Sequence, residues 1–151
     1  MIHIDVLNRD AISNYHTYKS HIAISICDPY DDFPKIPNVI SRVGLLQLQF
    51  HDWNGEQMVK IMNDYPNSEQ AKKMVFFSKE HAEKIVEFVK FNLKDISVII
   101  CQCDAGISRS AGVAAALSKC INGDDMFFFK RYLPNSLVYK TILEVWNDLS
   151  E

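Results

Sequence analysis

One ten-residue stretch of the sequence carries side chains that could do covalent chemistry on an anion. It runs Cys101-Gln102-Cys103-Asp104-Ala105-Gly106-Ile107-Ser108-Arg109-Ser110, between a β-branched run and an alanine-rich helical pattern. In a strand–loop–helix unit, the first amide groups of the helix lack intrahelical partners and the helix dipole is positive there, so the loop can surround a phosphate with donors. Glycine lets such a loop bend tightly. The pattern predicts a phosphate-binding loop made by Asp104, Ala105, Gly106, Ile107, Ser108 and Arg109.

The cysteine at the start of this loop has the position of a nucleophile. Cys103 feels the same field as the anion, so we expect a stabilised, accessible thiolate with a pKa below the ~8.5 of a free thiol. Arg109 lies six positions later, and its planar guanidinium can bind two phosphoryl oxygens at once. Attack of sulfur on phosphorus gives a cysteinyl-phosphate, and the leaving oxygen needs a proton from an acid on the opposite side. These residues indicate phosphomonoester hydrolysis without a metal or cofactor.

The elements around the loop follow from hydrophobic periodicity. Alternation predicts short strands at 3–6, 21–27 and 45–50, and the β-branched run at 96–101 predicts a central strand covered on both faces. Helical spacing predicts helices at 78–93, 110–120, 124–131 and 136–149, with Ser78 and Ser136 as N-caps. The predicted strands first alternate with helices along the chain, and the elements predicted after residue 101 are all helices. We therefore expect an α/β fold with a central, mostly parallel, twisted sheet of about four to five strands flanked by helices.

Two segments are expected to lie outside this framework. Residues 28–38 contain three prolines and three aspartates, which cannot continue a ladder, and they are predicted to form a surface loop. Residues 54–77 have no clear pattern, and the segment 65–68 is predicted to break the chain after a short helix.

Bulk composition restricts the class of protein. The 151 residues, 48% of them hydrophobic, suffice for one domain spanning residues 1–151. The formal net charge is −3 and the basic residues form no cluster, so no nucleic-acid partner is expected. Apolar runs stay short of the ~18–20 residues of a membrane span, and the N-terminus does not have the pattern of a signal peptide. We expect a soluble, cytoplasmic monomer with no membrane partner.

The four cysteines do not have the spacing of a disulfide framework. They stand at positions 27, 101, 103 and 120, and reduced thiols are the expected state. A zinc site is disfavoured, because the pair Cys101 and Cys103 lacks a second cysteine pair or nearby histidines. Burial on the strand is the expected role of Cys101.

Cys103-x5-Arg109-Ser110, with glycine at the third place after the cysteine, resembles the signature of the protein tyrosine phosphatase superfamily. Within it the chain is most similar to the compact dual-specificity branch. The resemblance covers most of the chain and includes a downstream Pro134-Asn135 that is similar to the segment opening the family's last helix. It implies the cysteine-phosphatase fold. It also implies that Cys103 attacks phosphorus, Arg109 binds phosphate, and the Ser110 hydroxyl assists release of the phosphoenzyme.

The resemblance also directs the search for the general acid. In the family this acid lies on a mobile loop after an earlier strand, and Asp52, which follows the strand at 45–50, matches that place. Asp64 remains the rival, and residues 54–77 would be an insertion. One departure is Gln102, since the family usually has histidine before the nucleophile. Because that histidine orders the loop and lowers the thiol pKa, activity is expected to be weaker or shifted to higher pH.

The expected substrates are phosphorylated proteins or peptides. Phosphotyrosine is the first choice, with phosphoserine and phosphothreonine also accepted, because a short chain has little room for a deep aromatic cleft. Inositol lipids are disfavoured because residues 104–108 contain no lysine, and Asp104 is expected to face solvent. Two other functions stay open: a phosphate-binding module without turnover, and a sulfur-transfer enzyme of the rhodanese type. Cys27, at the end of its strand, is a candidate for a reversible disulfide with Cys103.

Overall fold

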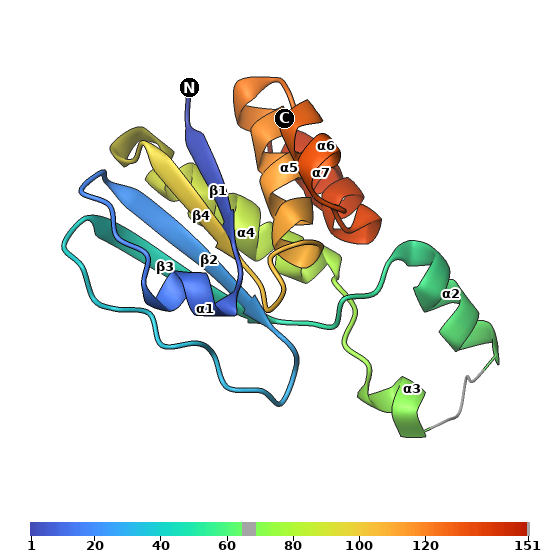
Figure 1. Ribbon diagram of the computed structural model, residues 1–151. Helices are drawn as coiled ribbons and strands as arrows, with labels where there is room; N and C mark the ends of the chain where they lie inside the picture. The colour runs from blue at the N-terminus through green and yellow to red at the C-terminus, as the bar shows by residue number, and fades with distance from the viewer. Residues whose placement is uncertain (65–68, 151) are drawn as a thin grey trace.

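A computed structural model describes residues 1–64 and 69–150, and within these ranges four strands form one sheet (Figure 1). The strand order is β1-β4-β2-β3, and every pair of neighbours is parallel. The predicted α/β class with a central parallel sheet is confirmed. The strands are β1 (His3–Leu7), β2 (His21–Cys27), β3 (Arg42–Gln49) and β4 (Val98–Gln102). β3 therefore starts three residues before the predicted strand, and β4 starts two residues after its prediction.

The helices are α1 (Arg9–Ser13), α2 (Gly55–Asp64), α3 (Glu69–Lys73), α4 (Lys79–Asn92), the 3₁₀ turn η1 (Leu93–Asp95), α5 (Arg109–Asn122), α6 (Met126–Arg131) and α7 (Ser136–Leu149). The helices predicted at 78–93, 110–120, 124–131 and 136–149 are present as α4, α5, α6 and α7 with shifted ends, whereas α1, α3 and η1 were not predicted. Ser78 caps α4 as predicted. The cap of α7 was predicted wrongly: it is Asn135, whose Oδ1 accepts from the amide of Val138, and Ser136 is the first helical residue.

Alternate strand residues supply two apolar layers. The larger core contains Ile22, Ile24 and Ile26 of β2 and packs against α4, α5 and α7. The smaller one lies on the opposite face, where Ala23 and Ile100 pack with Ile12 of α1. β4 is buried along its whole length, as a doubly covered strand should be.

Helix α5 packs closely against the start of α7. A Cβ atom on Gly112 would lie 2.9 Å from the carbonyl oxygen of Asn135, so glycine is required for this approach. The contact brings the Pro134-Asn135 segment against the loop that precedes α5. Two residues far apart in sequence, Ser108 and Asn135, thereby become neighbours.

The segment between Asp52 and α4 extends away from the sheet (Figure 1). It contains α2 and α3, and α2 has no buried residue. The short helix expected before the break is present as α2, while the predicted break at 65–68 lies outside the described residues. Among the helices in the described ranges, none has the length and apolar character to cross a bilayer.

Candidate active site

The predicted phosphate loop lies at the carboxyl end of β4 and rests on the neighbouring end of β1. The Cys103 amide donates to the carbonyl of Leu7 at 3.3 Å, and the Arg9 amide donates to the carbonyl of Asp104 at 3.1 Å. Gly106 has φ of 67°, and a Cβ there would lie 2.7 Å from the backbone nitrogen of Asn8. Both the left-handed backbone and this close approach require glycine at the bend.

The other side of the loop is tied to the segment before α7. Leu133 donates from its amide to the carbonyl of Ile107 at 3.1 Å, and Asn135 donates to the carbonyl of Ser108 at 3.0 Å. The carbonyl groups of Asp104, Ile107 and Ser108 are thus used for structure, whereas the amide groups of residues 104–109 donate to no acceptor in the described part of the chain. Ser108, the N-cap of α5, also makes no side-chain capping bond. A row of free donors at a helix N-terminus suits an anion.

Cys103 lies on the floor of this loop. Its Sγ is 3.0 Å from the Oγ of Ser110, the second residue of α5. The residue is only 2% exposed. The expectation of an openly accessible thiol is therefore wrong for this conformation, because the strand end and the loop enclose the side chain.

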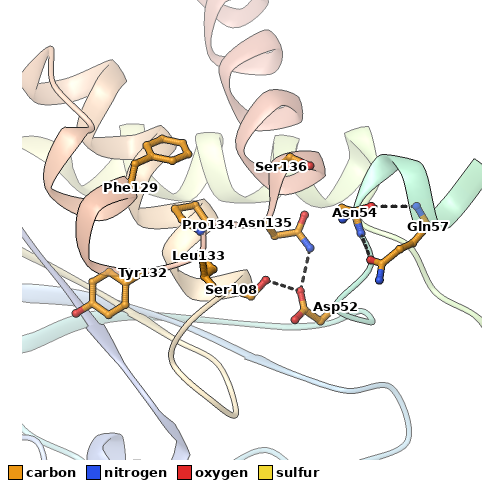
Figure 2. A pocket seen from close by; sticks show the side chains of 10 residues that line it. All are labelled: Asp52, Asn54, Gln57, Ser108, Phe129, Tyr132, Leu133, Pro134, Asn135 and Ser136. Atoms are coloured by element: carbon orange, nitrogen blue, oxygen red, sulfur yellow. Dashed lines mark hydrogen bonds between the residues drawn. The ribbon is translucent and has the colours of Figure 1, made fainter.

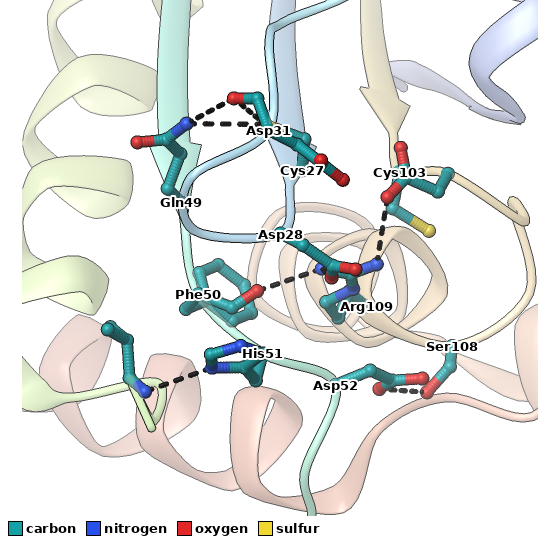
Figure 3. Close-up of polar contacts among 12 residues, drawn as sticks. Cys27, Asp28, Asp31, Gln49, Phe50, His51, Asp52, Cys103, Ser108 and Arg109 are labelled. Carbon is teal, nitrogen blue, oxygen red and sulfur yellow. Dashed lines mark hydrogen bonds and ion pairs between the residues drawn. The ribbon is translucent and has the colours of Figure 1, made fainter. Parts of the chain in front are cut away.

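Arg109 is also nearly enclosed, with 5% of the residue exposed. Its Nη1 donates to Oδ1 of Asp28 at 2.7 Å and to the carbonyl oxygen of Phe50 at 2.8 Å (Figure 3). Its Nη2 lies 3.5 Å from Oδ2 of Asp104. The Nε is buried and has no hydrogen-bond partner among the described residues. Leaving a buried guanidinium N–H unpaired costs about 1–3 kcal/mol, which an acceptor oxygen of a bound anion would offset.

Two carboxylates beside Arg109 were not expected there. Asp104 was predicted to face solvent, but its side chain is only 30% exposed and also pairs with Arg9 at 3.2 Å. Asp28 was assigned to a surface loop, although it directly follows β2. The carboxyl ends of the adjacent parallel strands β2 and β4 meet at one edge of the sheet. The position of Asp28 directly after a predicted strand was therefore a sequence signal that it lies near the loop after β4. The oxygens of Asp28, Asp31 and Asp104 lie within 4.8 Å of one another.

The structure brings Asp52 to the loop. Its Oδ1 accepts from the Oγ of Ser108 at 2.7 Å and from the Nδ2 of Asn135 at 2.9 Å (Figures 2 and 3). The rival acid, Asp64, is the last residue of α2, on the segment that extends away from the sheet (Figure 1). Asp52 therefore has the position of an acid at the rim of the loop, and Asp64 does not.

A cleft of about 470 Å³ adjoins Asp52 and Ser108 (Figure 2). Its wall is formed by the segment from Phe129 to Ser136, with Leu133 and Phe129 among the exposed large apolar side chains. Asn54 and Gln57 line it from the start of the extended segment. The cleft is thus continuous with the acid and with one end of the loop.

The residue before Cys103 is fully enclosed. Gln102 is 0% exposed, its Oε1 accepts from the hydroxyl of Ser25, and its Nε2 has no partner among the described residues. The Gln102 side chain is thus held by β2.

Of the other three cysteines, Cys27 and Cys101 are buried and Cys120 is half-buried. All four cysteines are free. Burial raises the pKa of Cys101 and of Cys27, and it raises the pKa of Cys120 to about 11. Cys27 ends β2 and lies near the amide of Gln49 and the carbonyl of Asp31. The disulfide between Cys27 and Cys103 stays a prediction.

Comparison with known proteins finds similarity in structure alone. No protein-family model matches the chain, and no curated protein matches it. Human DUSP28 superposes with a TM-score of 0.58 at 14% identity, over 97% of this chain and 93% of that one. PTPMT1 gives 0.52 at 12% identity, over 98% and 92%. A human tyrosine phosphatase-like serine/threonine/tyrosine-interacting protein gives 0.51 at 20% identity, over 88% and 80%.

Proposed function

We propose that this chain, which has the fold of the dual-specificity branch of the protein tyrosine phosphatases, is a cysteine-dependent phosphatase of phosphorylated proteins or peptides. Phosphotyrosine is the primary target, and phosphoserine and phosphothreonine are accepted as well. The observation that carries the proposal is the buried Nε of Arg109, next to the amide donors of residues 104–109, none of which has a hydrogen-bond acceptor among residues 1–64 and 69–150. A bound phosphoryl group would supply acceptors to all of these donors.

The first step forms a bond between sulfur and phosphorus. The Cys103 thiolate attacks phosphorus, the bond from phosphorus to the leaving oxygen breaks, and Asp52 gives its proton to that oxygen. Arg109 and the amides of residues 104–109 hold the equatorial oxygens, where charge develops in the transition state. The products are a cysteinyl-phosphate and the free hydroxyl of the substrate.

The second step breaks that bond. Water attacks phosphorus, Asp52 now takes a proton from the water, and the sulfur leaves as a thiolate. The hydroxyl of Ser110, 3.0 Å from Sγ, donates to the departing sulfur. Inorganic phosphate is released and the site returns to its starting state, so this scheme uses neither a metal nor a cofactor.

The cleft beside Asp52 and Ser108 supports an extended substrate. The leaving oxygen must lie next to Asp52, so the remainder of the substrate continues into the cleft of about 470 Å³. Its exposed Phe129 and Leu133 suit apolar side chains next to the phosphorylated residue. The four carboxylates at 28, 31, 32 and 104 repel additional phosphates, which disfavours inositol lipids.

A phosphatase assay of four proteins tests the proposal. We would measure hydrolysis of p-nitrophenyl phosphate from pH 5 to 8 by the wild type, Cys103→Ser, Asp52→Ala and Asp64→Ala. We expect no turnover by Cys103→Ser, a loss of about 10²–10⁴-fold for Asp52→Ala, and wild-type rates for Asp64→Ala. Turnover by Cys103→Ser would refute the cysteine mechanism.

A phosphate-binding module without turnover is the second candidate. It is favoured by the two carboxylates that hold Arg109, by the 2% exposure of Cys103, and by Gln102 in the place of histidine. Under this hypothesis, the wild type releases no phosphate at any pH but binds a phosphotyrosine peptide, and Arg109→Ala abolishes the binding. The same protein preparations serve both assays, so the two functions are distinguished directly.

A further inference from the structure

We propose that the groove between α2 and α7 holds the polypeptide next to the phosphorylated residue and selects substrates with a large apolar side chain on one side of that residue. This inference rests on the proposed function, since it names the class of phosphopeptide that the site would take. The α2 wall belongs to residues 54–77, the expected insertion, to which the signature motif assigns no task.

The groove continues the cleft beside Asp52. It has a volume of about 950 Å³ and is lined by residues of α2 and of the first part of α7. Asn54 and Ser136 line both this groove and the cleft (Figure 2). A polypeptide whose phosphoryl group lies in the loop can therefore pass the acid and run on between the two helices.

Val59 is an apolar side chain of the groove that stays open to solvent. It is 52% exposed on α2, and Leu137 lines the groove from α7. A Cβ atom on Gly55 would meet no atom of the described residues within 4 Å, so the groove is open at the start of α2. None of the ten residues of α2 is buried, although helices of this length depend on tertiary packing for their stability. An apolar side chain of a bound peptide would supply that packing.

The charges that line the groove balance. Each helix contributes one acidic and one basic residue four positions apart, Glu56 with Lys60 on α2 and Lys140 with Glu144 on α7. Two walls without net charge give no strong attraction for an acidic or a basic peptide. Apolar contact with Val59 and Leu137 is therefore the basis of selection.

Three phosphotyrosine peptides and a small substrate test the groove. The peptides carry leucine residues before the phosphotyrosine, leucine residues after it, or serine residues on both sides. We would divide kcat/KM for each peptide by kcat/KM for p-nitrophenyl phosphate, which is too short to extend past the acid. We expect the wild type to prefer one leucine peptide to the serine peptide by roughly 10-fold, the scale of an apolar side chain in a pocket.

Val59→Glu should remove this preference. Residue 59 is exposed and glutamate is a good helix former, so the substitution is compatible with the fold of α2. Met62→Glu is the matched control, because Met62 lies on the same helix, is 57% exposed and does not line the groove. For the preferred leucine peptide, the normalised kcat/KM should fall roughly 10-fold in Val59→Glu and keep the wild-type value in Met62→Glu.

Lys140→Glu should produce a gain that misfolding cannot imitate. The substitution makes the α7 wall doubly acidic, because Glu144 lies one turn away. A peptide with lysine in place of the preferred leucine should then be hydrolysed roughly threefold better by Lys140→Glu than by the wild type, the scale of an exposed ion pair. An unchanged normalised kcat/KM would show that the peptide does not run along α7, which overturns the inference.

The remaining outcomes are equally decisive. Equal rates of the wild type on leucine and serine peptides, or equal losses in Val59→Glu and Met62→Glu, would overturn the inference. A dimer that Val59→Glu dissociates without a change in peptide preference would also overturn it, because the groove would then hold a second copy of the chain. If the wild type hydrolyses no substrate, the proposed function has failed. Binding of the same peptides, measured by fluorescence anisotropy with the wild type and both α2 variants, then decides the inference on its own.

Discussion

Asp28 holds the guanidinium of Arg109: its Oδ1 lies 2.7 Å from Nη1, while Oδ2 of Asp104 lies 3.5 Å from Nη2. A phosphoryl group must compete with these carboxylates for the same N–H groups. The carbonyl of Phe50 also binds Nη1, so the orientation of Arg109 does not depend on Asp28 alone.

Removal of the Asp28 charge should therefore strengthen anion binding. Because its side chain is 46% exposed, the ion pair is worth about 1 kcal/mol at most, so we expect Asp28→Asn to lower the inhibition constant of orthovanadate by roughly fivefold. Asp32→Asn removes a charge from the same loop without contact to Arg109 and should change the constant much less. Weaker vanadate binding by Asp28→Asn would show that Asp28 orients the guanidinium instead of competing for it.

Ser110 should affect the second chemical step more than the first. Its hydroxyl is 3.0 Å from Sγ of Cys103 and can stabilise the sulfur as it leaves the cysteinyl-phosphate. A hydrogen bond to a charged group contributes about 1.5–3 kcal/mol, so Ser110→Ala should slow dephosphorylation roughly 10- to 100-fold. Rapid mixing with p-nitrophenyl phosphate should then show a burst of nitrophenol. Ser118→Ala, on the same helix, should show the steady state of the wild type.

Alkylation should distinguish Cys103 from the other thiols. Burial raises the pKa of Cys27 and Cys101, and that of Cys120 to about 11, so these groups stay protonated and unreactive near pH 7. Iodoacetate, an anion, should label Cys103 first, and inorganic phosphate should protect it. Mass spectrometry of digested protein identifies the labelled site, with Cys103→Ser as the control. Equal labelling of Cys120 would contradict the assignment.

His81 should make stability depend on pH. Its pKa is lowered, first by burial and then by Lys84, and its neutral Nδ1 accepts from the amide of Ser78 in the capping box of α4. The unfolded chain binds the proton near pH 6.5 and the folded chain resists it, so stability is complete above pH 6.5 and falls as the pH drops below it.

Glutamine at this position can form the same capping box without titrating. Urea unfolding at pH 7.5 and 5.5 should therefore show a smaller pH dependence for His81→Gln than for the wild type. The difference should be about 1 kcal/mol, the scale of one helix cap. Identical pH dependence of the two proteins would remove His81 from the explanation.

The sequence by itself determined the sheet class, most helices and the loop after β4. The sheet class and the helices follow from local hydrophobic periodicity. The loop follows from the order of residue types in a run of ten residues that includes Cys103, Gly106 and Arg109. It also placed Asp52 after a strand, where an acid could reach the loop. Each of these inferences depends only on residues that lie close together in the sequence.

Only the tertiary structure decided what surrounds the guanidinium and the acid. Asp28 and Arg109 are 81 positions apart, and Asn135 and Asp52 are 83 apart. Their contacts depend on the strand order β1-β4-β2-β3 and on the close packing of α5 against α7 at Gly112. Strand order and helix packing are set by long-range burial of side chains, which leaves no local pattern in the sequence. The enclosure of Cys103 has the same cause.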